Sequence, residues 1–181
     1  QRAREVHNQM TRLALALLVI GATLGAQPRF HSKVTIFDLK TRSTRTVWSS
    51  DTIVEAPNWS RDGKHLLINT GGRLYRLAVD VEGAQPEPLA LDPQYRCNND
   101  HDYSPDGRRV AFSASSPDSR GSQVYTANAG GSNVTRIIEK SPSYFHGWSP
   151  DGQSVAIVAQ RDGHYNLFRV PAAGGEEQPQ L

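Results

Sequence analysis

The chain has 181 residues, a formal net charge of +2 and one cysteine, Cys97. Residues 1–26 hold three arginines and one glutamate, so residues 27–181 are neutral, with 17 basic and 17 acidic side chains. A neutral body gives no electrostatic reason to expect nucleic acid or an anionic membrane surface as a partner. A single cysteine excludes an intramolecular disulfide and a structural zinc site built from several cysteines.

The first predicted element is a targeting segment. Met10, the only methionine, is followed by Arg12 and then by an apolar run of fourteen residues from Leu13 to Ala26. This run is too short for a transmembrane helix, which needs about 20 residues. The basic, apolar and small-residue order is typical of a secretory signal peptide, with a buried core helix as the alternative. We therefore expect residues 1–26 to be upstream residues and a leader that is removed near Gln27, leaving a periplasmic or secreted protein without membrane insertion.

Two short β-strands are predicted next, at 34–39 and 46–48. Both segments are rich in β-branched and aromatic residues, as strands are. They resemble the last two strands of a four-stranded unit whose first two strands are missing.

A turn motif then recurs along the chain. Its aspartates, Asp62, Asp106 and Asp151, lie 44 and then 45 positions apart. Proline presets the first central residue of such a turn, aspartate binds its own backbone, and glycine takes the positive φ. Apolar strands, a tight hairpin, a glycine turn and a short closing segment follow each copy. The three copies read Trp59-Ser60-Arg61-Asp62-Gly63, Tyr103-Ser104-Pro105-Asp106-Gly107 and Trp148-Ser149-Pro150-Asp151-Gly152.

Four strands in roughly 40–45 residues are the signature of a β-propeller blade. We place the repeats at about 55–91, 99–139 and 143–181, within a domain that covers 27–181. Propellers commonly have about 4–8 blades, so the predicted ring is incomplete. Because open blades leave apolar faces uncovered, we expect the chain to be unstable or to self-associate.

The recurring Trp-Ser-Pro-Asp-Gly motif resembles the repeat of TolB-like β-propellers over about residues 33–181. The resemblance implies an all-β fold: a TolB-like β-propeller, here partial, with about three and a half four-stranded blades of a ring that is usually six-bladed. It also implies a periplasmic setting. TolB itself has an N-terminal α/β domain, for which the short stretch between Ala26 and Val34 leaves no room, so TolB proper is not expected.

Two motifs that suggest chemistry are better explained as structure. The segment 147–151 begins like a nucleophile elbow, but Asp151 stands where that motif requires glycine. The segment 98–102 begins like an EF-hand calcium loop, but Tyr103 and Arg109 stand where a glycine and an acidic ligand are required. We therefore expect no catalytic residue, no metal site and no cofactor.

Aromatic residues precede the serine in all three turns, at Trp59, Tyr103 and Trp148. Such a row could stack against sugar rings. Equivalent positions of successive blades more often pack in the core, and we favour that interpretation.

The best candidate ligand site lies on the first strand of each unit. Counted from the turn, His101 and His146 occupy the same repeat position, Asp100 aligns with Phe145, and Asn99 aligns with Tyr144. The segment 96–102 is unusually polar for an innermost strand, and an unpaired buried polar group costs about 1–3 kcal/mol. We therefore expect ligand contacts from His101, His146, Asp100, Asn99 and Tyr144 at the mouth of the channel. The alternative is that these residues bond only to the neighbouring blade and to channel water.

Two classes of function fit this sequence. The first is a non-catalytic module that binds a protein or small ligand at the channel mouth. The second is the propeller portion of an enzyme, since similar propellers precede the hydrolase domain of prolyl-oligopeptidase-like serine peptidases and form oligogalacturonate lyases. The first is favoured because no nucleophile, base and orienting residue are recognisable together.

Overall fold

The computed structural model describes residues 30–180, so the expected leader at residues 1–26 lies outside the described residues. Within this range the chain forms fourteen β-strands and no helix. Accordingly, the described residues contain no helix of the length and apolarity that a membrane crossing requires.

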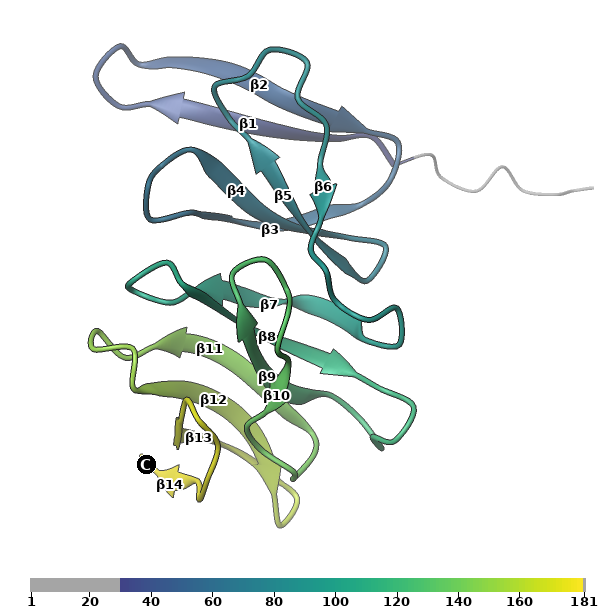
Figure 1. Cartoon of the computed structure of the whole chain (residues 1–181), viewed down its shortest axis with the longest axis vertical. Coiled ribbons are helices and arrows are strands. Elements are labelled where there is room, and N and C mark those ends of the chain that lie inside the picture. Colours follow the sequence, from purple (N-terminus) through teal and green to yellow (C-terminus); the bar gives the residue numbers. More distant parts are fainter. Residues whose placement is uncertain (1–29, 181) are drawn as a thin grey trace, which may run out of the picture.

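The strands form four antiparallel sheets that follow one another along the chain (Figure 1). A two-stranded half blade contains β1 (Ser32–Asp38) and β2 (Ser43–Ser50). Blade 1 contains β3 (Val54–Trp59), β4 (His65–Thr70), β5 (Arg73–Ala78) and β6 (Glu87–Pro88). Blade 2 contains β7 (Arg96–Tyr103), β8 (Arg109–Ser115), β9 (Gln123–Asn128) and β10 (Thr135–Arg136). Blade 3 contains β11 (Ser143–Trp148), β12 (Ser154–Arg161), β13 (His164–Pro171) and β14 (Gln178–Pro179). The predicted all-β class, with about three and a half four-stranded blades, is confirmed.

The repeated turn joins the first and second strands of every blade by the same network. The serine hydroxyl donates to the aspartate carboxylate over 2.6 Å in the first two copies and 2.5 Å in the third. The same hydroxyl oxygen accepts the N–H five residues ahead at 3.0 Å in all three. These bonds hold the pKa of each aspartate below its ordinary value, with the serine hydroxyl as the largest cause. The motif therefore fixes a tight turn.

The blades are held together by apolar side chains on facing sheets. One buried cluster joins blades 1 and 2 and includes Leu67 and Phe112, both 0% exposed. A second cluster joins blades 2 and 3 through Ala111, Val155 and Ile157. Blades 1 and 2 thus each contribute one face of the second strand to the preceding seam and the other face to the following seam.

Side-chain hydrogen bonds cross two of these seams, and in both seams the side chain stands at the same position of the repeat. Asn69 Nδ2 donates to the carbonyls of Cys97 at 3.1 Å and Asn98 at 2.8 Å. Ser113, 44 positions further along, accepts the N–H of Phe145 at 2.7 Å through its hydroxyl oxygen. In both seams the second strand of one blade therefore binds the first strand of the next.

The aromatic residues before the turns do not share one environment. Tyr103 is 4% exposed, and Trp148 donates its indole N–H to the carbonyl of Asp102 beneath the Arg109 guanidinium. Both confirm the packing interpretation. Trp59 is 47% exposed, because within residues 30–180 the half blade in front of it contributes only β1 and β2 and leaves the ring uncovered.

Gly63 and Gly131 both have positive φ, but only Gly131 also lies close to the backbone of another blade. A Cβ at Gly131 (φ +95°) would lie 2.7 Å from the backbone nitrogen of Ala90 in blade 1, whereas one at Gly63 (φ +70°) meets nothing within 4 Å. We expect Gly63→Ala to destabilise the fold by about 1–2 kcal/mol, the usual cost of the left-handed conformation. Gly131→Ala should cost at least about 1 kcal/mol more, because the backbone of blade 1 must also shift. Urea unfolding of both variants checks this, and equal losses would refute the close approach.

Candidate functional site

The first strands of the three complete blades lie side by side (Figure 1). β3, β7 and β11 are each an edge strand of their own sheet, and β7 contacts both of the others. Innermost strands line the central channel of a propeller, so the outward edges of these three strands are the part of the chain that corresponds to a channel wall.

Every one of these strands carries a β-bulge in its middle. The pairing shifts between Glu55 and Asn58 in β3 and between Phe145 and Gly147 in β11. In β7 the shift is larger: Cys97 pairs with Ala114 and His101 with Phe112, so two extra residues are accommodated between them. Bulges re-aim side chains and interrupt the ladder, and here they coincide with the polar residues predicted as the site.

Asp100 stands in the bulge of β7 and is half-buried. Its carboxylate accepts a 2.9 Å hydrogen bond from Asn98 Nδ2. Burial raises the pKa of Asp100, while the Asn98 amide and the nearby His146 act in the opposite direction. Asn99, next to it, is exposed.

Two of the predicted residues on β11 lie near this carboxylate. His146 is exposed, and Tyr144 is half-buried. The pKa of Tyr144 is raised by burial first, then by the phenol of Tyr165 and the charge of Asp100. Asp100 and Asn99 thus lie in the bulge of β7, and Tyr144 and His146 lie on β11, the strand that β7 contacts.

His101 lies elsewhere. Its side chain is 3% exposed, and neither ring nitrogen has a hydrogen-bond partner among residues 30–180. Burial lowers the pKa of His101 to about 4, partly opposed by the backbone groups of Leu67, Asn98 and Ala56. Two of those groups belong to blade 1, so the ring lies in the seam between blades 1 and 2.

The separation of the two histidines follows from the bulges. His101 pairs with Phe112, and the extra residues of β7 precede it. In β11 the histidine itself is the extra residue, and Phe145 pairs with Ile157, the counterpart of Phe112. Counting residues from the turn therefore aligns His101 with His146, although in space the counterpart of His101 is the buried Phe145.

One further residue, Asp102, belongs to this part of the wall. Asp102 is half-buried, pairs with Ala111 and has a pKa raised by burial. Its position two residues after Asp100, the period of a strand, is a sequence signal that could have identified it. Tyr165 lies outside the wall, on β13, the third strand of blade 3, and is 55% exposed. Its partner Gln160 places it on the same face of blade 3 as Tyr144, whose partner is Val158.

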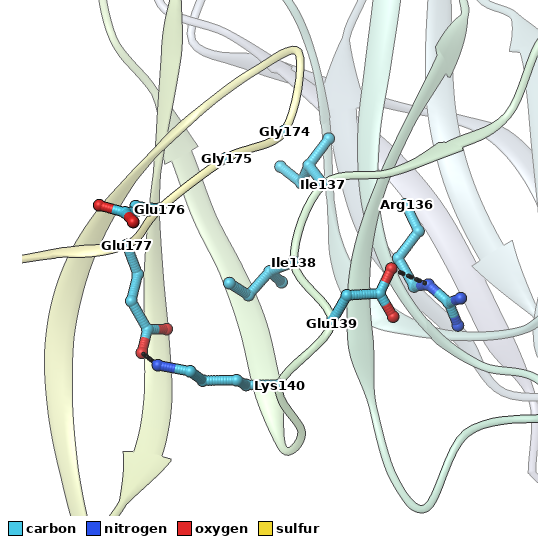
Figure 2. A pocket seen from close by; sticks show the side chains of 9 residues that line it. All are labelled: Arg136, Ile137, Ile138, Glu139, Lys140, Gly174, Gly175, Glu176 and Glu177. Carbon is cyan, nitrogen blue, oxygen red and sulfur yellow. Dashed lines mark hydrogen bonds and ion pairs between the residues drawn. The ribbon is translucent and has the colours of Figure 1, made fainter.

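Within the described range, no three His, Cys, Asp or Glu side chains are grouped so that they could hold a metal ion. A separate groove of about 530 Å³ lies between residues 136–140 of blade 2 and 174–177 of blade 3 (Figure 2). Ile137 and Ile138 line it, and a 2.6 Å ion pair between Lys140 and Glu177 crosses it. Glu177 also pairs with Arg161 of β12 over 2.6 Å, so Glu177 links the segment after β10 to the second strand of blade 3.

Consecutive four-stranded sheets whose first strands line a common channel define a β-propeller. The chain belongs to the TolB β-propeller domain family, whose model matches residues 28–179.

Individual proteins agree with this assignment. The uncharacterised protein Atu1656 of Agrobacterium fabrum is 38% identical over 149 residues, which make up 81% of this chain and 50% of that protein. A solved TolB-like chain from Agrobacterium tumefaciens is 35% identical with a TM-score of 0.77, over 86% of this chain and 55% of that one. TolB from Acinetobacter baumannii is 19% identical with a TM-score of 0.63, over 81% and 37%, and shows the fold alone. The chain thus spans about half the length of the curated relative it matches.

Proposed function

We propose that this chain is part of an exported, periplasmic propeller that binds a protein or small ligand at the mouth of its channel and catalyses no reaction. The observation that carries the proposal is the polar bulge of β7, where Asp100 is half-buried on the strand next to the one that carries Tyr144 and His146. An inner strand that served only to hold the blade would need no half-buried carboxylate. Removing such a group from water without a partner costs free energy. Ligand contact accounts for them.

The proposed location rests on the leader. The order of basic, apolar and small residues in Thr11–Ala26 supports export. Family membership supports the same compartment, since TolB-like relatives are periplasmic.

The alternative, the propeller of an enzyme, has weaker support. An oligogalacturonate lyase solved with manganese is 13% identical with a TM-score of 0.60, over 81% of this chain and 41% of that one. Similarity at 13% identity concerns the fold alone, and the same fold carries different functional sites in different proteins.

Replacement of His146 by alanine tests the binding proposal. His146 is exposed on the channel wall, so His146→Ala should leave the melting temperature within about 1 °C of the parent's. The amount of partner retained from a periplasmic extract by the immobilised protein should fall about tenfold, as loss of one good contact predicts. Quantitative mass spectrometry of the retained proteins gives the readout.

The matched control is His164→Ala, since His164 is exposed on the hairpin between β12 and β13, away from the channel wall. It should retain partners as the parent does. Equal retention by the two variants would place the binding surface elsewhere.

A further inference from the structure

A pocket of about 300 Å³ lies in the seam between blades 1 and 2, beside the repeated turns. Blade 1 contributes its Ser-x-Asp-Gly turn, His65 and Arg76 to the lining, and blade 2 contributes Tyr103, its own turn and the segment after β9. Both blades have all four strands within residues 30–180, so described elements border the pocket on both sides. Its volume lies at the lower end of the range for small-ligand pockets, about 300–1,000 Å³.

Two small side chains account for this pocket. Counted from the serine of the turn, Tyr103 corresponds to Trp148, and His65 corresponds to Arg109. In the seam between blades 2 and 3, the Arg109 guanidinium lies 4.9 Å from the centre of the Trp148 ring and donates to the carbonyl of Gly152 at 2.5 Å. Tyrosine and histidine are smaller than tryptophan and arginine, so the same place between blades 1 and 2 stays open.

Tyr103 brings a hydroxyl without a protein partner to this pocket. The residue is 4% exposed, and its ring packs in the cluster that joins blades 1 and 2. Among residues 30–180 it forms hydrogen bonds only through its backbone, which donates to Asp102 and accepts from Arg61. Unlike the ring nitrogens of His101, the hydroxyl is not enclosed by protein, so it opens into the pocket that Tyr103 lines. Such a group gains free energy from a hydrogen bond to a ligand.

The rim of the pocket carries balanced charges with free hydrogen-bonding atoms. Arg61 and Arg76 supply two guanidinium groups, and Asp62 and Asp106 supply two carboxylates. Each carboxylate accepts the hydrogen bonds of its own turn through Oδ1, so Oδ2 is free within the described range. Arg61 donates through Nε and Nη2 to two carbonyls of blade 2, which leaves the N–H groups of Nη1 free in the same range. Donors and acceptors therefore surround one small pocket.

We propose that this seam pocket binds the ring of a neutral sugar. A sugar hydroxyl both donates and accepts, so neighbouring hydroxyls donate to the carboxylates of Asp62 and Asp106 and accept from Tyr103 and Arg61. Balanced charges favour neither an anion nor a cation. Ala129 is the one aliphatic side chain in the lining, so an apolar ligand would find little surface to cover. This site is separate from the channel wall, and the inference goes beyond the proposed function.

Titration of the complete chain with single sugars, followed by ligand-observed NMR, tests the proposal. The probes are D-glucose, D-galactose, D-mannose and N-acetyl-D-glucosamine, and at least one should bind with a Kd of about 1 mM or tighter. Tyr103→Phe removes only the hydroxyl, so it should weaken that sugar about tenfold. Because this hydroxyl has no partner among residues 30–180, the melting temperature should stay within about 1 °C of the parent's.

A second variant removes a guanidinium without disturbing the turn. Arg61→Pro gives the first turn the proline that Pro105 and Pro150 provide in the other two copies, so the turn should still form. This variant should also weaken the sugar about tenfold. The matched control is Tyr165→Phe, which removes a hydroxyl from an exposed tyrosine outside this pocket and should bind as the parent does.

Tyr103→Trp combined with His65→Arg introduces the pair of side chains that fills the next seam, and it should abolish sugar binding. Tyr103→Phe keeps the test decisive even where this double variant folds poorly. Failure of every sugar to bind, or parent affinity in Tyr103→Phe, would overturn the inference. Glycine serves as a zwitterionic probe, and glycine binding as tight as that of the best sugar would overturn it too, because the pocket would then select opposite charges and not hydroxyls.

Discussion

Replacement of Phe112 by alanine should lower the free energy of unfolding by about 3–5 kcal/mol, the range for an aromatic core residue. The Phe112 ring is fully buried between blades 1 and 2. It stacks on Tyr125 with ring centroids 5.6 Å apart and meets Tyr95 edge-on at 6.1 Å. Alanine would leave a cavity in the seam that holds the two blades together. Urea unfolding followed by tryptophan fluorescence measures the loss.

Phe37→Ala is the control for this substitution. Phe37 exposes 53% of its surface on the half blade, so its removal should cost less than about 1 kcal/mol. Similar losses in the two variants would mean that blades 1 and 2 do not pack through Phe112.

Acidification from pH 7 to pH 4 should remove about 3 kcal/mol of stability through His101 alone. The pKa of His101 in the fold is about 4, against an ordinary value of 6.5, because burial disfavours the charged ring. The unfolded chain therefore takes up the proton first, and the stability present above pH 6.5 is lost as the pH falls toward 4. The loss follows from about 1.4 kcal/mol per pKa unit.

Carboxylates produce different pH dependences. Asp100 and Asp102 have raised pKa values, so their protonation in the fold relieves a cost and partly offsets the loss near the acidic end of this window. Asp62, Asp106 and Asp151 have lowered pKa values, so their turns lose stability only below about pH 4.

Urea unfolding at pH 7, 6, 5 and 4 distinguishes these contributions. His101→Leu should flatten the decline between pH 6.5 and 4, whereas His164→Leu, at an exposed histidine, should keep it. A His101→Leu variant with the parent's pH dependence would show that the ring titrates normally and does not lie buried in the seam.

The repeat made the fold predictable from the sequence. Three Ser-x-Asp-Gly turns at nearly equal spacing define the blades, because each turn's hydrogen bonds are local and depend only on residues within five positions. The strands that follow are determined by short apolar runs. Fold class and strand order therefore follow from nearby residues alone.

The site was less predictable, because bulges are not visible in a residue count. The two extra residues of β7 and the single extra residue of β11 give His101 and His146 different environments. The polar segment 96–102 forms the strand with the largest bulge, and its contact with a ligand stays a prediction. Tyr165 shares a face of blade 3 with Tyr144 only through the pairing of both strands with β12.

In the proposed function the inner strands, and not the outer surface, meet the partner. Photo-crosslinking in cells tests it most directly, with p-benzoylphenylalanine placed singly at Asn99, Tyr144, Phe37 or Glu176. The first two positions lie on the inner strands, and the last two are exposed away from them. We expect partner adducts from Asn99 and Tyr144 and none from Phe37 or Glu176. Adducts formed only from Phe37 or Glu176 would contradict the account.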